Sequence, residues 1–400
     1  MIAGRSVEKV MEKTIEEIPI YIDGSVGEGG GQIIRTSVSL AAITGRTVEI
    51  SNIRAGRSKP GLQAQHLTSV LSAAALCSAQ VYGAEIGSTY LRFVPGVPTS
   101  EHSFLFDVSA ARVGGSAGAT GLVVQTLLVP LAHLQNQGKT KDITAVEVVG
   151  NAREDAAFAE IRGGTHVPMA PTADYLEAVY LPALRRLGLE ATLTNPKAGF
   201  FPRGGGAVEL TLSRPHLVTP LDLTERGRLL KIRLIITTSE LPAHVGERGR
   251  DALLKTLRGY GVPIEVELRD LPGGGAGAAL VIVAECENGI GGWTGLGERG
   301  KPMERVAEGA LHDFQKWFAT SAAVDEHLSD QLVLPCALID GEHKDGEGRE
   351  RNGESRWTTP TVTEHLRTVL AIVKKFLPIT YRIEERTDGS GLVSLKGVRV

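Results

Sequence analysis

Apolar residues along this chain form short runs with strand-like alternation and longer stretches with helical spacing, and glycine-rich turns separate them. Residues 18–93 thereby predict one unit with the order β-α-β-α-β-β. Its elements are a strand at 18–22, a turn at 23–31, a helix from Ile33 to Ala41, a strand at 48–50, a helix from Pro60 to about Cys77, and strands near 80–83 and 90–93.

The same order recurs further along the chain at a spacing of roughly 90–100 residues. The second copy predicts a strand at 104–108, a turn at 114–118, a helix to Leu131, a strand at 145–149, a helix at 172–187 and strands at 191–194 and 207–211. The third, weaker copy predicts helices at 324–338 and 364–376 and strands at 358–362, 379–383 and 391–395.

A different pattern lies between the second and third copies. It predicts strands at 230–237, 264–269 and 279–285 and helices at 245–260 and 302–318. The fold expected is therefore α/β (α+β), with three repeated β-α-β-α-β-β modules and one inserted smaller α/β domain. The large domain spans 18–219 and 319–400, the insertion spans 220–318, residues 1–17 form a polar N-terminal extension, and 343–356 form a charged mobile loop.

The composition is that of a globular protein, with 400 residues, 42% hydrophobic and 22% charged. Its three cysteines are far apart and show no metal-ligand spacing, so we expect neither a disulfide framework nor a zinc site, and a reducing compartment, nucleus or cytoplasm. No secretory signal or membrane span is recognisable. A net charge of −3 excludes a bulk polyanion binder, so any nucleic-acid contact requires a local basic patch.

The first glycine-rich turn, 23–31, follows a strand and precedes a helix. Backbone N–H groups in such a turn, together with the helix dipole, form an anion site. The run has neither the Walker A nor the dinucleotide spacing, so a phosphate site and a structural tight turn both remain open. Glu28 within it either binds a cation, handles a proton, or simply faces solvent.

Basic residues follow this turn. Arg35 lies in the next helix, and Arg54 and Arg57 lie in a short loop whose Gly and Pro residues restrict its shape. Arginine presents a planar fork that suits phosphate oxygens, although solvated surface arginines are the plain alternative. His66 lies at the edge of an apolar helical face, where a partly buried histidine is the simpler interpretation.

His365 is the sharpest single candidate. Thr361 and Glu364 read as a capping box, which places His365 in the first turn of a helix. The dipole at that end disfavours imidazolium, so a neutral, nucleophilic imidazole is expected there, with an ordinary surface histidine as the alternative. His327 and Asp330 lie three residues apart on another helix and form either a functional pair or an ordinary polar face.

Together these motifs resemble the RNA 3′-terminal phosphate cyclase family. The matching runs lie at 23–35, 53–67, 114–118, 200–206 and 327–334, with His365-Leu366 and Phe376-Leu377-Pro378. The resemblance implies three repeated modules with one insertion, and a three-step reaction. A histidine attacks the α-phosphorus of ATP, AMP passes to the RNA 3′-phosphate to give RNA-pp-A, and the 2′-OH displaces AMP to leave a 2′,3′-cyclic phosphate.

The resemblance also assigns residues by motif position. It implies His365 as the adenylylated nucleophile, with Glu28 and Asp330 as further catalytic residues and Glu28 as the contact for Mg²⁺ or Mn²⁺. The implied nucleotide-binding residues are Gln331, His327, Pro168, Gln65 and Trp293. The implied RNA-phosphate residues are Arg35, Arg54, Arg57 and His66. His327 stands where the family typically has the tyrosine that forms one adenine wall, so base stacking has less area here.

Two other functions compete with a cyclase. One is a non-catalytic relative that serves in ribosome assembly, which would lack the nucleophile and several arginines. The other is an enolpyruvyl transferase, whose fold also repeats related modules and which needs no histidine nucleophile. Retention of His365, Glu28, Arg54 and Arg57 favours the cyclase. The expected partners are therefore ATP and RNA 3′-phosphate ends, with no membrane.

Overall fold

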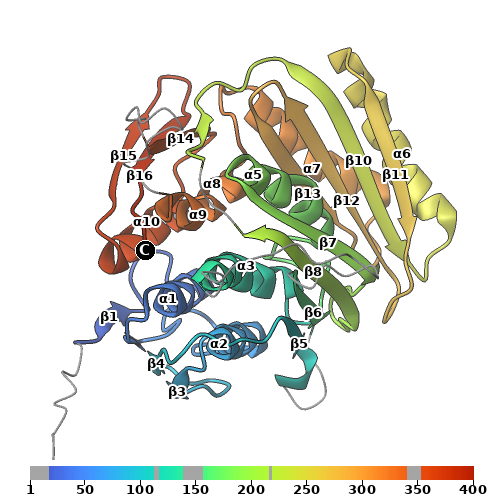
Figure 1. Ribbon diagram of the computed structural model, residues 1–400. Helices are drawn as coiled ribbons and strands as arrows, with labels where there is room; N and C mark the ends of the chain where they lie inside the picture. The colour runs from blue at the N-terminus through green and yellow to red at the C-terminus, as the bar shows by residue number, and fades with distance from the viewer. Residues whose placement is uncertain (1–17, 112–116, 138–155, 216–218, 340–352) are drawn as a thin grey trace, which may run out of the picture.

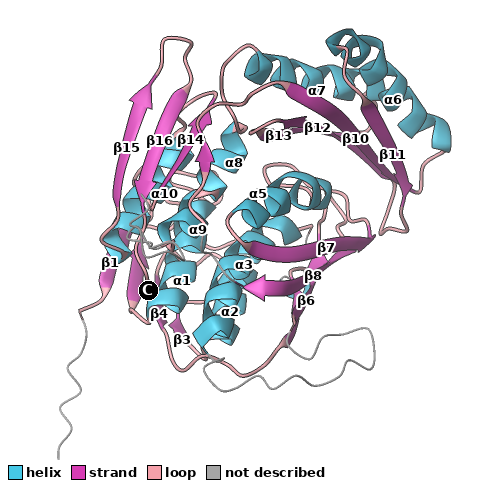
Figure 2. Ribbon diagram, turned by 45° about the horizontal axis from the view of Figure 1, so that its top comes forward, coloured by secondary structure: helices cyan, strands magenta, loops and turns pink. Residues whose placement is uncertain are grey.

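The computed structural model describes residues 18–111, 117–137, 156–215, 219–339 and 353–400. The described residues form four four-stranded sheets with helices packed against them, so the predicted α/β class is confirmed (Figures 1 and 2). The extension 1–17, the strand expected at 145–149, residues 114–116 of the second glycine turn and most of the charged segment 343–356 lie outside the described residues.

The first sheet has the strand order β1-β2-β4-β3, and α1 and α2 lie against it (Figure 1). Its elements are β1 (Ile20–Asp23), α1 (Gly31–Thr44), β2 (Val48–Ser51), α2 (Ala64–Leu76), β3 (Gln80–Tyr82) and β4 (Leu91–Val94). Strands β1 and β2 are parallel, so the turn after β1 and the arginine loop after β2 leave the same edge of the sheet. The Asn52 amide, which donates to Asp23 at 3.3 Å, ties the two together.

The second sheet, β5-β6-β8-β7, packs against α3. Its elements are β5 (Ser103–Asp107), the 3₁₀ turn η1 (Ser109–Ala111), α3 (Thr120–Gln137), β6 (Ala157–Gly163), α4 (Ala173–Tyr175), the π-helical turn η2 (Leu176–Tyr180), α5 (Leu181–Arg186), β7 (Leu189–Lys197) and β8 (Gly206–Pro215). The third sheet, β15-β16-β14-β9, lies with α8, α9 and α10. Its elements are β9 (Asp222–Leu223), α8 (Glu326–Gln331), α9 (Val333–Ala337), β14 (Glu354–Thr359), α10 (Glu364–Phe376), β15 (Thr380–Glu385) and β16 (Gly391–Lys396).

Helix α1 lies at the centre of these three groups and packs against α2, α3 and α10. The fourth sheet, β11-β10-β12-β13, has an apolar cluster of its own around Phe314 and Trp317. Its elements are β10 (Leu229–Ser239), α6 (Ala243–Leu257), the 3₁₀ turn η3 (Arg258–Tyr260), β11 (Ile264–Asp270), β12 (Gly277–Cys286), β13 (Ile290–Leu296) and α7 (Met303–Phe318). No helix in the described ranges combines the length and apolarity that crossing a membrane requires.

Two predicted helices are irregular, and each contains a proline near the irregularity. The helix expected at 324–338 is divided into α8 and α9, and Pro335 has no N–H for the Gln331 carbonyl. The helix expected at 172–187 contains the π-helical turn η2, and Pro182 likewise cannot donate to Ala178. The module boundaries and the residue limits of the domains stay predictions.

Other elements begin or end at different residues than predicted. Helix α2 starts at Ala64 rather than at Pro60. The strand expected at 358–362 is β14, which starts at Glu354 and so takes up the end of the segment expected to be a loop. Strands β6, β9 and β13 were not predicted. Only three of the seven residues at 290–296 are large apolar or aromatic residues, and three glycines among them obscure the strand pattern of β13.

Candidate active site

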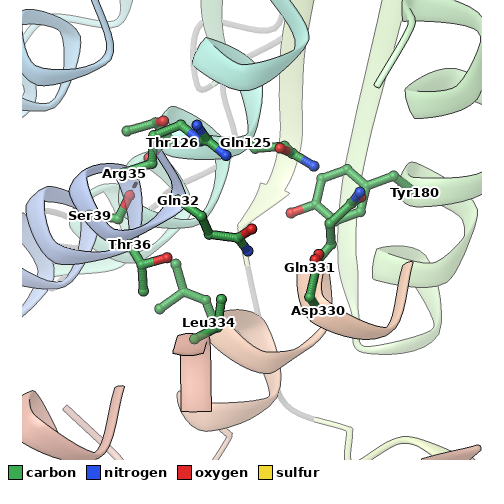
Figure 3. A pocket seen from close by; sticks show the side chains of 11 residues that line it. Gln32, Arg35, Thr36, Ser39, Gln125, Thr126, Tyr180, Asp330, Gln331 and Leu334 are labelled. Atoms are coloured by element: carbon green, nitrogen blue, oxygen red, sulfur yellow. Dashed lines mark hydrogen bonds between the residues drawn. The ribbon is translucent and has the colours of Figure 1, made fainter. Parts of the chain in front are cut away.

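A cavity of about 400 Å³ brings together residues from α1, α3, α8, α10 and β13. Among the residues predicted for the site, those lining it are Arg35, Trp293, His327, Asp330, Gln331 and His365. A smaller pocket of about 50 Å³ adjoins it and shares Gln32, Arg35, Gln125, Asp330 and Gln331. Figure 3 shows Gln32 extending from α1 toward Asp330 and Gln331 on the facing helix. Chain segments that are far apart in sequence therefore form one site.

His365 is the second residue of α10 and lies at the mouth of this cavity. The predicted capping box is wrong. The N-cap is Thr363, whose hydroxyl accepts a hydrogen bond from the Leu366 N–H at 3.1 Å, and its extended backbone makes it the last residue before the helix. The buried residues Leu366, Val369, Leu370 and Val373 anchor the helix behind the histidine. His365 is thus held in a first helical turn, as expected, but by a different cap.

The contacts of His365 define its protonation. Its Nδ1 lies 2.8 Å from Gln32 Oε1, and its Nε2 lies 3.9 Å from Glu28 Oε2. Burial lowers the pKa of His365 below 6.5, against the raising effect of the Glu28 carboxylate, and Arg35 lowers it further. A neutral ring that donates its Nδ1 proton to Gln32 leaves the Nε2 lone pair free and directed away from that bond. The geometry therefore supports a nucleophilic imidazole.

Glu28 lies in the turn between β1 and α1, and its side chain is only 5% exposed. Arg57 donates to Glu28 Oε2 at 2.8 Å and to the Glu28 carbonyl at 2.7 Å, while Glu28 N donates to the Thr368 hydroxyl of α10 at 3.2 Å. Glu28 Oε1 is buried without a hydrogen-bond partner. An unpartnered carboxylate oxygen is the ligand type that Mg²⁺ and Mn²⁺ prefer. The described residues contain no cluster of three or more His, Cys, Asp or Glu that could hold a metal ion.

His66 is buried and faces the first residue of α1. Its Nδ1 accepts a hydrogen bond from Gln63 N at 3.1 Å, so the imidazole caps α2 and its proton lies on Nε2. Burial lowers the pKa of His66 to about 3, and Arg35 and Arg54 lower it as well, so the ring stays neutral. A Cβ on Gly31 would overlap His66 Nε2 and would lie 2.9 Å from Arg35 Nη1. The absence of a side chain at Gly31 therefore lets both groups approach the turn.

Arg35 and Arg54 differ in burial and in how many of their guanidinium N–H groups are already hydrogen-bonded within the protein. Burial lowers the pKa of Arg35 to about 10, and Glu28 and Asp330 oppose that effect, so Arg35 remains a cation. Arg54 uses Nη1 to bind the carbonyl oxygens of Lys59 and Gly61 at 2.7 and 3.0 Å. It therefore fixes the shape of its own loop while the rest of its guanidinium stays available.

Asp330 and Gln331 form the opposite wall. Burial raises the pKa of Asp330 to about 7, although His327 and Arg35 oppose the rise. Gln331 Oε1 and Trp293 Nε1 are buried without partners, and both residues line the cavity. Buried polar atoms without partners are rare in native proteins, so their presence around one cavity indicates a site for a polar ligand.

Six of the predicted residues are absent from the cavity lining, namely Glu28, Arg54, Arg57, His66, Pro168 and Gln65. Pro168 is exposed, and its neighbours Val167 and Met169 line the cavity in its place. Gln65 accepts a hydrogen bond from Ala119 N at 3.2 Å and so supports the segment before α3. The assignment of Pro168 and Gln65 to nucleotide binding stays a prediction.

The structure adds Gln32 to the site, a residue that the sequence indicated only as part of a longer motif. Its spacing of three residues from Arg35, which places both on one helix face, was the available signal.

Comparison with known proteins finds relatives along nearly the whole chain. The family model described as RNA 3′-terminal phosphate cyclase matches residues 26–383. A protein of that name from Nostoc punctiforme is 40% identical over 379 residues, which cover 95% of this chain and 99% of the relative. The proteins of that name from Methylococcus capsulatus and Salmonella agona are 41% and 37% identical over 379 and 370 residues, covering 94% and 92% of this chain and 96% and 95% of theirs.

These relatives are bacterial proteins, so they give no support to the nuclear location that the sequence analysis left open. The family match spans most of the chain and includes the Glu28 turn, the arginine loop and His365. It confirms both the resemblance drawn from the motifs and the expectation of an enzyme. This chain belongs to the RNA 3′-terminal phosphate cyclase family.

Proposed function

We propose that the protein uses ATP to convert an RNA 3′-terminal phosphate into a 2′,3′-cyclic phosphodiester, through a covalent adenylate on His365. The observation that carries this proposal is a neutral His365 whose Nδ1 is bound to Gln32 and whose Nε2 is free at the cavity mouth. Family membership supplies the reaction class. An enolpyruvyl transferase is ruled out by the family, and a non-catalytic assembly factor would have no use for this arrangement.

The first step joins His365 to AMP. Nε2 attacks the α-phosphorus, a P–N bond forms, the bond to the bridging oxygen breaks, and pyrophosphate leaves. In the second step an oxygen of the RNA 3′-phosphate attacks the same phosphorus, the P–N bond breaks, and RNA-pp-A forms. In the third step the 2′-OH attacks the RNA phosphorus, loses its proton, and displaces AMP. Transfer of AMP activates the RNA end, because AMP is a good leaving group in the third step whereas a bare phosphate oxygen is not.

The residues around the cavity suit these steps. Trp293 and His327 offer aromatic surface for the base, and Gln331 offers an unpartnered amide oxygen to a nucleotide donor. Arg35 and Arg57 supply positive charge beside the His365 ring. His66 contributes a neutral Nε2–H donor to a phosphate oxygen. Glu28, through Oε1, would contact Mg²⁺ or Mn²⁺, which neutralises phosphate charge when bound.

The proposal is tested by incubating the protein with α-labelled ATP, Mg²⁺ and an RNA oligonucleotide ending in a 3′-phosphate. We expect label on the protein that acid removes and alkali does not, followed by label in AMP and an oligonucleotide end that resists phosphatase. A folded protein that neither takes up label nor protects the RNA end from phosphatase would refute the proposal.

The pH dependence of His365 labelling follows from its lowered pKa. Protonation of Nε2 removes the attacking lone pair, so the labelling rate should be constant above pH 7 and fall only below the usual histidine pKa of about 6.5. Gln32→Glu places a carboxylate next to Nδ1, which raises the pKa of His365 and should move the acid limb to higher pH. Burial raises the pKa of Asp330 to about 7, so its titration also falls within this pH range. The profile of Asp330→Asn, measured in parallel, separates the contribution of Asp330 from that of His365. If the acid limb of the labelling profile lies at the same pH in Gln32→Glu as in the wild type, the assignment of His365 as the titrating nucleophile is contradicted.

A further inference from the structure

The carboxylate of Asp325 lies at the junction of three walls of the nucleotide cavity. Asp325 is only 1% exposed. Its Oδ1 accepts hydrogen bonds from the backbone N–H groups of His327 and Leu328, both at 2.9 Å, and its Oδ2 accepts from Gly292 N at 3.0 Å. The Tyr175 hydroxyl lies 3.0 Å from both oxygens. One buried carboxylate therefore joins α8, β13 and the end of α4.

Three of these partners themselves line the cavity, namely Tyr175, Gly292 and His327. They come from segments that are far apart in the chain, and none of them adjoins another in sequence. Asp325 itself is absent from the lining, so its effect on a bound nucleotide would be exerted through the residues that it holds. The arrangement places Asp325 behind the walls rather than in contact with the ligand.

The close approach of β13 to Tyr175 depends on glycine. A Cβ on Gly292 would lie 2.9 Å from Tyr175 Cδ2 and 2.6 Å from Val179 Cγ2, which are distances that real Cβ atoms do not show. The bare backbone of Gly292 thus packs directly on the tyrosine ring while its N–H reaches Asp325. The carboxylate of Asp325 therefore binds both sides of this contact.

The cost of burying this charge argues for a specific role. Burial raises the pKa of Asp325, and the groups that donate hydrogen bonds to it in the described residues are backbone N–H groups and one hydroxyl, all of them neutral. A neutral cap such as serine or threonine would satisfy the start of α8 at lower cost. A carboxylate is needed to accept from α8 on one oxygen and from β13 on the other.

We propose that Asp325 is a positioning residue for ATP, which holds Tyr175, Gly292 and His327 in the relative positions that the base requires. The inference rests on the proposed function for the identity of the nucleotide. It predicts that weakening the junction raises the ATP concentration needed for half-maximal reaction while the rate at saturating ATP changes little, because His365 and Gln32 lie on other elements.

Two substitutions separate this role from simple helix capping. Asp325→Asn keeps an oxygen for the His327 and Leu328 N–H groups but turns an amide nitrogen toward Gly292 N–H, so α8 stays capped and the link to β13 is lost. Tyr175→Phe removes only the hydroxyl. Ser355→Ala is the matched control, because Ser355 is buried, accepts from Leu221 N at 3.1 Å, and lies outside the cavity lining.

The experiment measures His365 labelling against ATP concentration, ATP binding by calorimetry, and the melting temperature of each protein. We expect the half-saturating ATP concentration to rise about tenfold for Asp325→Asn and about threefold for Tyr175→Phe, with maximal rates within about twofold of wild type. Ser355→Ala should lower the melting temperature alone.

An unchanged ATP dependence in folded Asp325→Asn and Tyr175→Phe would overturn the inference. If Asp325→Asn does not fold, Tyr175→Phe decides. If wild type binds ATP in the calorimeter but takes no label, the proposed function fails, and the calorimetric affinities of the same variants still decide the role of Asp325.

Discussion

Replacing His365 with alanine should abolish the transfer of AMP from ATP to the protein and, with it, cyclisation of the RNA end. The imidazole of His365 is the attacking group. Among the described residues, His327 also lines the cavity, but the histidine that is hydrogen-bonded to Gln32 is His365. We expect both rates to fall by at least about 1000-fold, as when a covalent nucleophile is removed from other enzymes. The melting temperature should change little, because the ring is 50% exposed. Label retention on the protein and the RNA end product are measured.

His244 provides the matched control. It is the exposed second residue of α6, as His365 is of α10, and it lies outside the cavity. His244→Ala should therefore leave both rates unchanged. Undiminished labelling of His365→Ala would mean that another residue carries the AMP, and the reaction sequence proposed for this cavity would then be wrong.

Replacing Gly31 with alanine should have the second-largest effect. The added methyl group would overlap His66 Nε2 and press on Arg35 Nη1, and the His66 ring cannot retreat easily because it is buried and holds Gln63 N. Overpacking of this kind costs about 1–3 kcal/mol of folding free energy. Displacement of these two groups by about 1 Å should lower the rate of RNA cyclisation by about 100-fold. Thermal unfolding and steady-state cyclisation report the two effects.

Gly309→Ala tests whether the loss is specific to the site. Gly309 also lies within a helix, α7, and a Cβ there would meet open space. Alanine at Gly309 should be neutral or should stabilise the protein by up to about 1 kcal/mol. Normal cyclisation by Gly31→Ala would show that the approach of His66 and Arg35 to the turn is not needed for the reaction.

The fold could be predicted where the hydrophobic pattern was strong and local. The helix predicted at 364–376 matches α10 because an apolar stripe marks it, although its N-cap is Thr363 and not the predicted Thr361. The division at residue 332 and the π-helical turn at 176–180 involve carbonyls that Pro335 and Pro182 cannot bond, and the apolar stripe gave no sign of either. Strand β13 was missed because its glycines serve close tertiary contacts, among them the approach of Gly292 to Tyr175.

The candidate site was predictable as a set of residue types but not as a geometry. His365, Asp330 and Glu28 were identified from motifs, while the cavity that joins the first two depends on α1, α8 and α10 meeting. The bond between Gln32 and His365 joins residues 333 positions apart. Asp325 gave no signal beyond that of an ordinary N-cap, because its other partners, Gly292 and Tyr175, come from distant segments.

The most direct test of the account is the position of AMP on the protein. Wild-type protein is incubated with ATP and Mg²⁺ without RNA, digested under alkaline conditions that preserve a phosphoramidate, and mapped by tandem mass spectrometry. We predict AMP on the peptide containing His365, joined through Nε2, because Nδ1 is bound to Gln32. AMP on any other residue of folded, RNA-active protein would contradict the central claim that His365 is the nucleophile.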